Sequence, residues 1–264
     1  MDLKKSHSST YMEAFKLNNS RTFTKSRFNF LNAHKGLRPG CLHGILGPMG
    51  CGKSTLAKAI IEDSSVDRNV ATLLSEETIA EYQMKIGEEF SGNFSWIEEK
   101  DLPPEDIFDF HSYYAKLRET VVNNGIDVLV VDNVTTGFMY ADEHGPKGQA
   151  VSSKLLHKLA KETNLAILYL AHTKKNYDLN AKVIMVNEDI RGSARLPIIS
   201  EYMYLFHKIT VRNKIYAILK SSKNRLHENA TGYYLLDYRF GSYRGDRKLP
   251  FSEFKKIFKD ADRL

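Results

Sequence analysis

Four short runs of mostly apolar residues recur along the first two thirds of the chain. They are Cys41–Leu46, Asn69–Leu74, Ile126–Val131 and Leu165–Leu170. Runs of this length without polar alternation are typical of strands that are buried on both faces of a sheet. We therefore expect each run to form a central strand of one sheet.

The segments between these runs are predicted to be helices at Ser54–Ile61, Thr78–Phe90, Glu105–Asn123 and Val151–Thr163. In the second and third of them, apolar residues are spaced by three and four positions, which is the spacing of an amphipathic helix. Helices that alternate with strands indicate an α/β fold, in which a mostly parallel sheet is flanked by helices on both faces.

The final third of the chain has a different pattern. Strand-like segments at Glu201–His207, Lys214–Lys220 and Gly232–Tyr238 are joined by short connections, and apolar residues from Phe251 to Phe258 predict a last short helix. We therefore expect antiparallel strands at the C-terminal end of the parallel sheet.

The N-terminal segment differs from the rest in composition. Residues 1–27 are polar and basic, which predicts an N-terminal arm or linker ahead of a single domain at 28–264. Two interpretations stay open: a loose tail, or an arm that docks on a neighbouring subunit or on DNA.

Composition narrows the setting of the protein. The 264 residues are 42% hydrophobic, enough for one sizeable core, and the net charge of +6 is compatible with a polyanionic partner. Neither Cys41 nor Cys51 suits a structural disulfide, so we expect a reducing, cytoplasmic location. No apolar run approaches the roughly 20 residues that cross a membrane, and no membrane partner is expected.

Directly after the first apolar run, the chain fits the phosphate-loop pattern G-x-x-x-x-G-K-[ST]. The loop consists of Gly47, Pro48, Met49, Gly50, Cys51, Gly52, Lys53, Ser54 and Thr55. Its glycines allow backbone N–H groups to surround a phosphate, and the following helix adds its positive dipole end. Lys53 can reach the β- and γ-phosphates, and the Ser54 hydroxyl can ligate Mg²⁺. The sequence therefore predicts a nucleoside triphosphate site.

Acidic residues follow two of the predicted strands. Asp132 ends the most apolar strand, and in phosphate-loop enzymes such an acid completes the Mg²⁺ site with the loop serine, here Ser54. Glu76 and Glu77 follow the strand at Asn69–Leu74, where a carboxylate can orient or deprotonate the attacking water. We prefer Glu76 for this role, although both acids also suit a helix start.

A histidine follows a third core strand. His172, in Leu170-Ala171-His172-Thr173, is predicted to detect the γ-phosphate and to relay its presence to the segment that follows. A structural role at the strand end is the alternative.

In this order, these features resemble the RecA-fold ATPases, specifically the DnaB/RepA-like replicative helicases in their single-domain form. The resemblance covers roughly residues 28–245. It also rests on Gly36–Gly40 (G-L-R-P-G), on Asp189–Ser193 (D-I-R-G-S) and on Lys223–Arg225 (K-N-R). It implies a RecA-like core, ATP with Mg²⁺ as cofactors and a homo-oligomer, with a hexameric ring as the expected form.

The resemblance also implies roles for basic residues. Lys223 and Arg225 would cross a subunit interface and contact the γ-phosphate held by the neighbouring copy, as an arginine finger does. The segment Lys174–Glu188 corresponds to the family's DNA-binding loop. The residues expected to bind single-stranded DNA are Lys174, Lys175, Lys182 and Arg191.

Three functions follow as hypotheses: a ring-forming helicase motor, a RecA-type protein that coats or anneals single strands, and a small-molecule kinase. The motor is preferred, with replication or recombination proteins as possible partners. A kinase would need an arginine-rich lid, which neither Asp189–Ser193 nor Lys223–Arg225 provides. Asp142 and Glu143, in the loop predicted at Thr135–Gln149, would repel DNA, so strand separation itself stays open.

Overall fold

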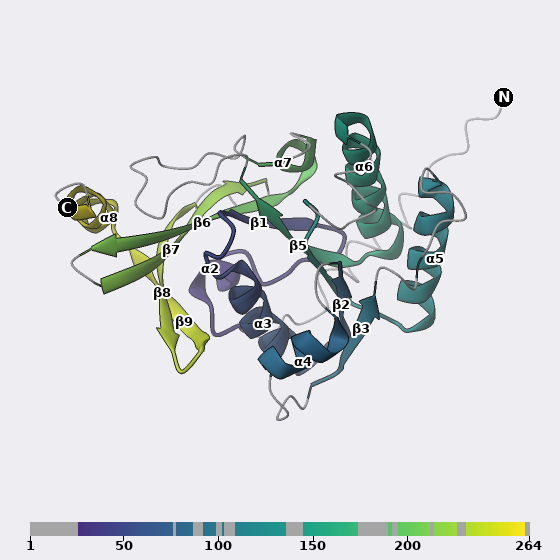
Figure 1. Ribbon diagram of the computed structural model, residues 1–264, viewed down its shortest axis with the longest axis horizontal. Coiled ribbons are helices and arrows are strands. Elements are labelled where there is room, and N and C mark those ends of the chain that lie inside the picture. Colours follow the sequence, from purple (N-terminus) through teal and green to yellow (C-terminus); the bar gives the residue numbers. More distant parts are fainter. Residues whose placement is uncertain are drawn as a thin grey trace, which may run out of the picture.

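A single mixed sheet organises the protein. The computed structural model describes residues 26–75, 78–86, 92–98, 102, 109–135, 145–173, 190–191, 195–211, 214–225 and 231–261. Within these residues, nine strands pair in the order β3-β2-β4-β5-β1-β6-β7-β8-β9 (Figure 1).

The first five strands form the parallel half of the sheet. They are β1 (Leu42–Gly47), β2 (Val70–Leu74), β3 (Phe94–Glu98), β4 (Val128–Asp132) and β5 (Ala166–His172). All four apolar runs are confirmed as strands, and residues of β1, β2 and β5 are buried throughout. The sequence missed β3, because this edge strand is mostly half-buried and has no continuous apolar run.

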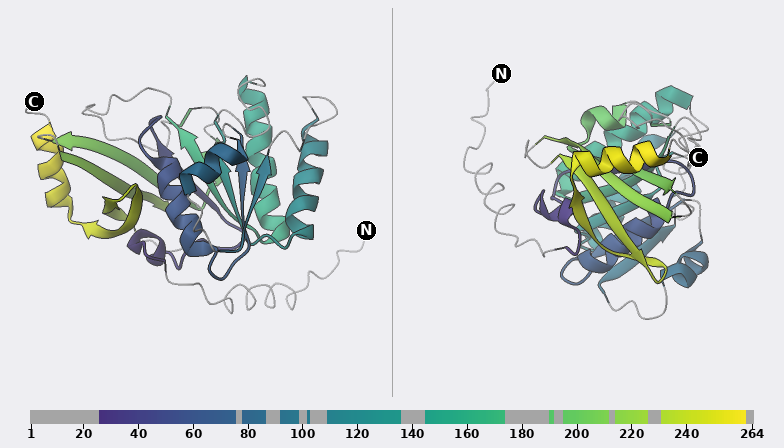
Figure 2. Two further views of the ribbon diagram at one scale, coloured as in Figure 1. Left: turned by 60° about the horizontal axis from the view of Figure 1, so that its bottom comes forward. Right: turned by 90° about the vertical axis from the view of Figure 1, so that its left-hand side faces the viewer.

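Helices cover both faces of the parallel half, as predicted (Figure 2). On one face, α5 (Phe110–Asn123) and α6 (Gly145–Thr163) pack on the sheet, and α3 (Lys53–Ser64) packs on the other. The short helix α2 (Asn29–Asn32) lies over the C-terminal part of the sheet, where Phe30 contacts Tyr204 and Tyr234. The aromatic side chain of Tyr82 in α4 (Ile79–Ile86) meets Trp96 of β3.

Two predicted helix starts need comment. The helix α6 begins at Gly145, so the prediction of a loop that extends to Gln149 is wrong. Pro146 is tolerated there, because a proline in the first helical turn removes an N–H group that has no partner within the helix. Asp109 caps α5 by accepting a hydrogen bond from Ser112 N at 2.9 Å. Residues 105–108, which were predicted to begin this helix, lie outside the described residues.

The C-terminal third adds antiparallel strands, as predicted. Strand β6 (Tyr202–Val211) pairs in parallel with β1, and β7 (Lys214–Asn224), β8 (Gly232–Arg239) and β9 (Ser242–Leu249) follow in antiparallel order. The sequence missed β9 because this edge strand is polar and buries only Tyr243 and Leu249.

Two further helices belong to this half. The expected last helix is α8 (Phe251–Ala261), whose Phe254 and Ile257 pack on β6 and β7. A one-turn helix, α7 (Arg195–Ile199), precedes β6 and was not predicted. Among the described residues, no helix is long and apolar enough to cross a membrane.

Candidate functional site

The glycine-rich loop connects β1 to α3. Gly50 and Gly52 have φ angles of +69° and +103°, a region that favours glycine, and Gly52 is the N-cap of α3. A Cβ atom on Gly47 would approach Cys51 Sγ to 2.9 Å and the Phe206 carbonyl oxygen to 3.0 Å. The loop therefore packs so closely against β6 that Gly47 has no space for a larger residue.

Lys53 is folded back over this loop. Its side chain is buried, and Nζ donates hydrogen bonds to the carbonyl oxygens of Gly47 at 3.0 Å and of Pro48 at 2.7 Å. The ammonium group thus lies beside the N-terminus of α3, where the helix dipole also favours negative charge. These donors fit a phosphate group.

Strand register places the other predicted residues at the carboxyl ends of the parallel strands, where the glycine-rich loop also lies. His172 pairs with Gly47 across β5 and β1, and Asp132 pairs with Leu74 across β4 and β2. Ser54 lies in the first turn of α3. The Ser54 hydroxyl and the Asp132 carboxylate fit Mg²⁺, which prefers oxygen ligands and takes only a few from the protein. Glu76 and Glu77 lie outside the described residues.

Hydrogen bonds join the ends of three of these strands. Ser75 Oγ donates to the Asp132 carbonyl oxygen at 3.0 Å and accepts from Asn133 N at 3.0 Å. Asn133 Oδ1 accepts from Thr135 N at 2.8 Å. Thr135 Oγ1 in turn accepts from His172 N at 2.9 Å. Sequence reasoning missed Ser75 and Thr135, although their position directly after strands is a usable signal.

The chain continues from His172 into the predicted DNA-binding segment. Thr173 and Ile190 form an antiparallel bridge, and Arg191 N donates to the His172 carbonyl oxygen at 2.7 Å. Thr173 and Ile190, which flank residues 174–189, therefore lie together near the glycine-rich loop. Lys174, Lys175 and Lys182 lie outside the described residues.

A cavity of about 820 Å³ adjoins the glycine-rich loop. Gly50, Gly52 and Thr55 line it from the loop side, and Lys208 and Tyr238 line it from the antiparallel strands. Its volume is within the range of small-molecule sites, so it has room for a nucleotide whose phosphates lie in the loop.

Tyr243 of β9 braces the loop from the same side. A Cβ atom on Gly52 would approach the Tyr243 hydroxyl to 2.9 Å. Burial raises the pKa of this phenol, so the side chain is neutral. The polar sequence of β9 gave no signal for this contact.

Lys223 and Arg225 lie at the opposite end of the strands from the glycine-rich loop. Asn224, between them, pairs with Tyr202, and Tyr202 pairs with His43 near the start of β1. The strand predicted to end at Lys220 extends to Asn224, so Lys223 lies within β7. At about 3.3 Å per residue, the four residue steps from His43 to Gly47 put about 13 Å between Asn224 and the level of the glycine-rich loop.

Both cationic side chains bind backbone oxygens of α7. Lys223 Nζ donates to the carbonyl oxygens of Pro197 and, at 2.9 Å, of Ile198. Arg225 Nη2 also donates to the Ile198 carbonyl oxygen. Partial burial and the neighbouring Arg225 charge lower the pKa of Lys223, whereas Glu201 opposes this shift. Neither side chain extends toward the glycine-rich loop of its own chain.

Comparisons with known proteins agree with this site. The family described as "ABC transporter" matches residues 31–168, just over half of the chain. The Escherichia coli (strain K12) protein named "Probable iron export ATP-binding protein FetA" is 25% identical over 193 residues, which are 58% of this chain and 82% of that protein.

A solved structure shows the same fold. The KaiC-like protein from the hyperthermophilic archaeon Pyrococcus horikoshii OT3 superposes with a TM-score of 0.62 at 13% identity, over 86% of this chain and 98% of that chain. The chain therefore combines a RecA-like sheet with a glycine-rich loop that suits the cofactors ATP and Mg²⁺. By its match over residues 31–168, the chain belongs to the ABC transporter family of ATP-binding domains, and it is a P-loop ATPase.

Proposed function

We propose that this ATPase is a motor on single-stranded DNA that works as a closed, hexameric ring and acts as a DnaB/RepA-like helicase. ATP would be bound by one copy through Lys53, Ser54, Asp132 and His172, with Glu76 activating the water. The next copy would supply Lys223 and Arg225. The observation that carries this proposal is that Lys223 and Arg225 lie at the end of the strands opposite their own glycine-rich loop.

This position favours action between copies. About 13 Å of sheet separates the strand segment of the cationic pair from its own loop, which is more than an extended arginine side chain spans. If a second copy docks head to tail, Lys223 and Arg225 of one copy come close to the glycine-rich loop of the next. Repeated contacts of this kind close into a ring when the rotation between copies permits.

The contacts at α7 suit such a role. Lys223 and Arg225 donate to neutral carbonyl oxygens, so these contacts do not neutralise their charges. A γ-phosphate is a stronger acceptor for a cation than a carbonyl oxygen is. Binding of a neighbour's ATP would therefore draw the two side chains away from Ile198.

The DNA partner is proposed from the segment that follows His172. The residues that flank it, Thr173 and Ile190, pair with each other beside the proposed ATP site. Movement of His172 on ATP binding or release would therefore reach both ends of residues 174–189. Lys174, Lys175, Lys182 and Arg191 would hold phosphates of the single strand, which gives binding that is independent of sequence and weakened by salt.

The test is ATP turnover with and without single-stranded DNA, together with unwinding of a forked duplex. We expect DNA to stimulate turnover, and Arg225→Ala to lower turnover by at least about 10³-fold while ATP still binds, as for other arginine fingers. Arg118→Ala, at an exposed arginine of α5, is the control and should match the wild type. Full turnover in Arg225→Ala would remove the proposal.

The similarity to FetA supports a second candidate, an ATPase subunit of an exporter. In that case turnover would be indifferent to DNA, and the same experiment would show it. The first candidate is preferred because Lys223 and Arg225 lie outside the matched residues 31–168, in the antiparallel half of the sheet.

A further inference from the structure

We infer that His34 is a positioning residue for the Lys223–Arg225 pair, acting through the side chain of Asn224. This inference rests on the proposed function, because it assigns His34 a role in the delivery of the pair to a neighbouring ATP site. The contacts that carry it lie at the end of β7, beneath α2.

A β-bulge sets the direction of the side chains at this strand end. Met203 of β6 pairs with Lys223, whereas the next residue, Tyr204, pairs with Ser221. Ser222 is therefore an extra residue in β7, and its hydroxyl donates to the Met203 carbonyl oxygen at 3.2 Å. A bulge of this kind redirects the side chains that follow it.

The bulge brings two side chains of β7 onto one face. In a regular strand, residues three positions apart point to opposite faces of the sheet. Because Ser222 is extra, Ser221 and Asn224 both contact the ring of His34. Lys223 and Arg225, on either side of Asn224, reach α7 instead. The contact between Asn224 and His34 thus fixes the strand segment that carries both cations.

The imidazole ring of His34 is itself fixed. It is fully buried, with ring centroids 5.2 Å from Tyr202 and 5.8 Å from Tyr204. Asn224 Nδ2 lies 2.8 Å from Nδ1, and Ser221 Oγ lies 3.1 Å from Nε2. An amide NH₂ group only donates, so Nδ1 of His34 is the acceptor from Asn224. The ring proton is therefore on Nε2, which donates a hydrogen bond to Ser221 Oγ.

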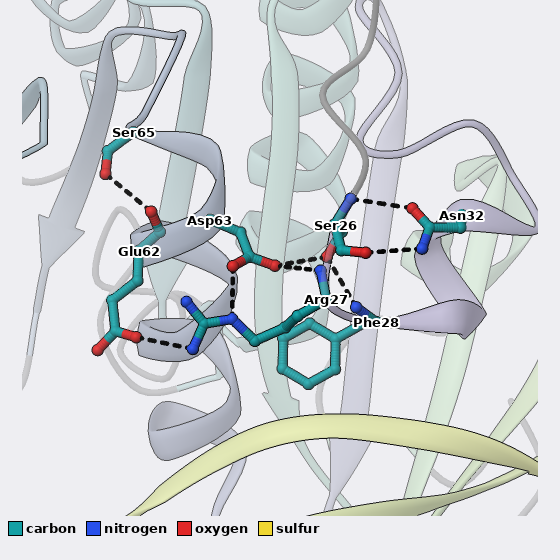
Figure 3. A network of polar contacts seen from close by, with 7 residues as sticks. All are labelled: Ser26, Arg27, Phe28, Asn32, Glu62, Asp63 and Ser65. Atoms are coloured by element: carbon teal, nitrogen blue, oxygen red, sulfur yellow. Dashed lines mark hydrogen bonds and ion pairs between the residues drawn. The ribbon is translucent and has the colours of Figure 1, made fainter.

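His34 also belongs to a segment that is bonded to the helix of the ATP site. Figure 3 shows Ser26 and Arg27 hydrogen-bonded to Asp63 near the end of α3. The carboxylate of Asp246 in β9 accepts hydrogen bonds from the backbone N–H groups of Asn29 and Phe30. Residues 26–34 therefore connect α3, which begins at Lys53, with the strand end that carries Lys223 and Arg225.

Two variants at the same ring separate positioning from simple structural support. Asn224→Ala removes the hydrogen bond between His34 Nδ1 and the strand segment that carries Lys223 and Arg225. Ser221→Ala removes the hydrogen bond at Nε2 of the same ring. We expect Asn224→Ala to lower kcat by up to about tenfold, the effect of one lost hydrogen bond, with the Kd of a fluorescent ATP analogue unchanged. Ser221→Ala should stay within about twofold of the wild type in both quantities.

Variants of His34 provide an independent check that does not alter β7. His34→Asn keeps an acceptor near the position of Nδ1, whereas His34→Gln places its amide near Nε2. We expect His34→Asn to retain more kcat than His34→Gln, with urea unfolding confirming that both are folded. Equal kcat in the two folded variants would overturn the inference.

A mixing experiment tests whether the defect acts on the neighbour. Lys53→Ala has a defective loop but intact fingers, so adding it to Asn224→Ala should raise turnover per Asn224→Ala copy. A merely structural defect would give no rise, which would overturn the inference. If Arg225→Ala loses turnover while Asn224→Ala keeps it, the inference alone fails. If Arg225→Ala keeps full turnover, the proposed function fails and this inference with it.

Discussion

Lys53, Lys223 and Arg225 are the three cations assigned to ATP, and each donates a hydrogen bond to a backbone carbonyl oxygen. Lys53 does so within its own loop, and the other two do so at α7. Such contacts hold a long side chain in place without neutralising its charge, so the side chain remains available to a phosphate. The same local principle therefore prepares both sides of the proposed composite site.

Another single residue makes stability depend on pH. Burial in β6 lowers the pKa of His207 to about 4, below its ordinary value of 6.5. Between these two values the unfolded chain binds a proton that the folded chain does not, so the free energy of unfolding falls as the pH falls. We expect His207→Leu to flatten this decline between pH 6.5 and 4, as measured by urea unfolding.

His111→Gln is the control for this prediction, since His111 lies exposed on α5. It should leave the slope of unfolding free energy against pH as it is in the wild type. An unchanged slope in His207→Leu would show that His207 is not the group responsible.

At the scale of residues, motif spacing and strand ends allow the sequence to predict where the glycine-rich loop, Asp132 and His172 lie, although their roles stay predictions. The roles of Ser75, Thr135 and His34 depend on which strand ends meet. That pairing is a tertiary property, and a lone histidine after a one-turn helix gives no sign of it.

Among the elements, the N-terminal segment before α2 and the helix α3 are held together by a polar cluster. Asp63 accepts hydrogen bonds from Ser26 Oγ, Arg27 N and Arg27 Nε, and its side chain is 14% exposed (Figure 3). Glu62 contacts Arg27 as well, but through one bond at 3.1 Å and with 30% of its side chain exposed. The cluster therefore depends mainly on Asp63.

We expect Asp63→Ala to lower the free energy of unfolding by about 2 kcal/mol, because it removes a partly buried charged acceptor of several donors. Glu62→Ala, the matched change one residue earlier, should cost less than about 1 kcal/mol, as exposed ion pairs do. Urea unfolding of both variants measures the difference. Equal losses would mean that Asp63 is not the centre of the cluster.

The elements that the sequence could predict are those with buried continuous apolar runs, such as β4 and β5. The elements it missed lie where burial is partial, since β3 and β9 are the two edges of the sheet. An edge strand contacts a neighbour on one side only, so its sequence carries little hydrophobic signal. The one-turn helices α2 and α7 are too short to show a helical period.

For the molecule as a whole, the length of the strands separates the two groups of residues that we propose to act on ATP. The carboxyl ends of the parallel strands carry the glycine-rich loop, Asp132 and His172. Lys223 and Arg225 lie at the end of β7, level with the amino ends of the parallel strands. Since neither end carries all the groups of the proposed site, we expect efficient hydrolysis to require at least two copies.

The most direct measurement mixes Lys53→Ala with Arg225→Ala, two variants that we expect to be nearly inactive alone, and records ATP turnover. In mixed assemblies, an intact loop from one copy meets an intact finger from the next at about a quarter of the interfaces. We expect the mixture to recover roughly that fraction of wild-type turnover. No recovery in a mixture that demonstrably co-assembles would contradict hydrolysis between copies.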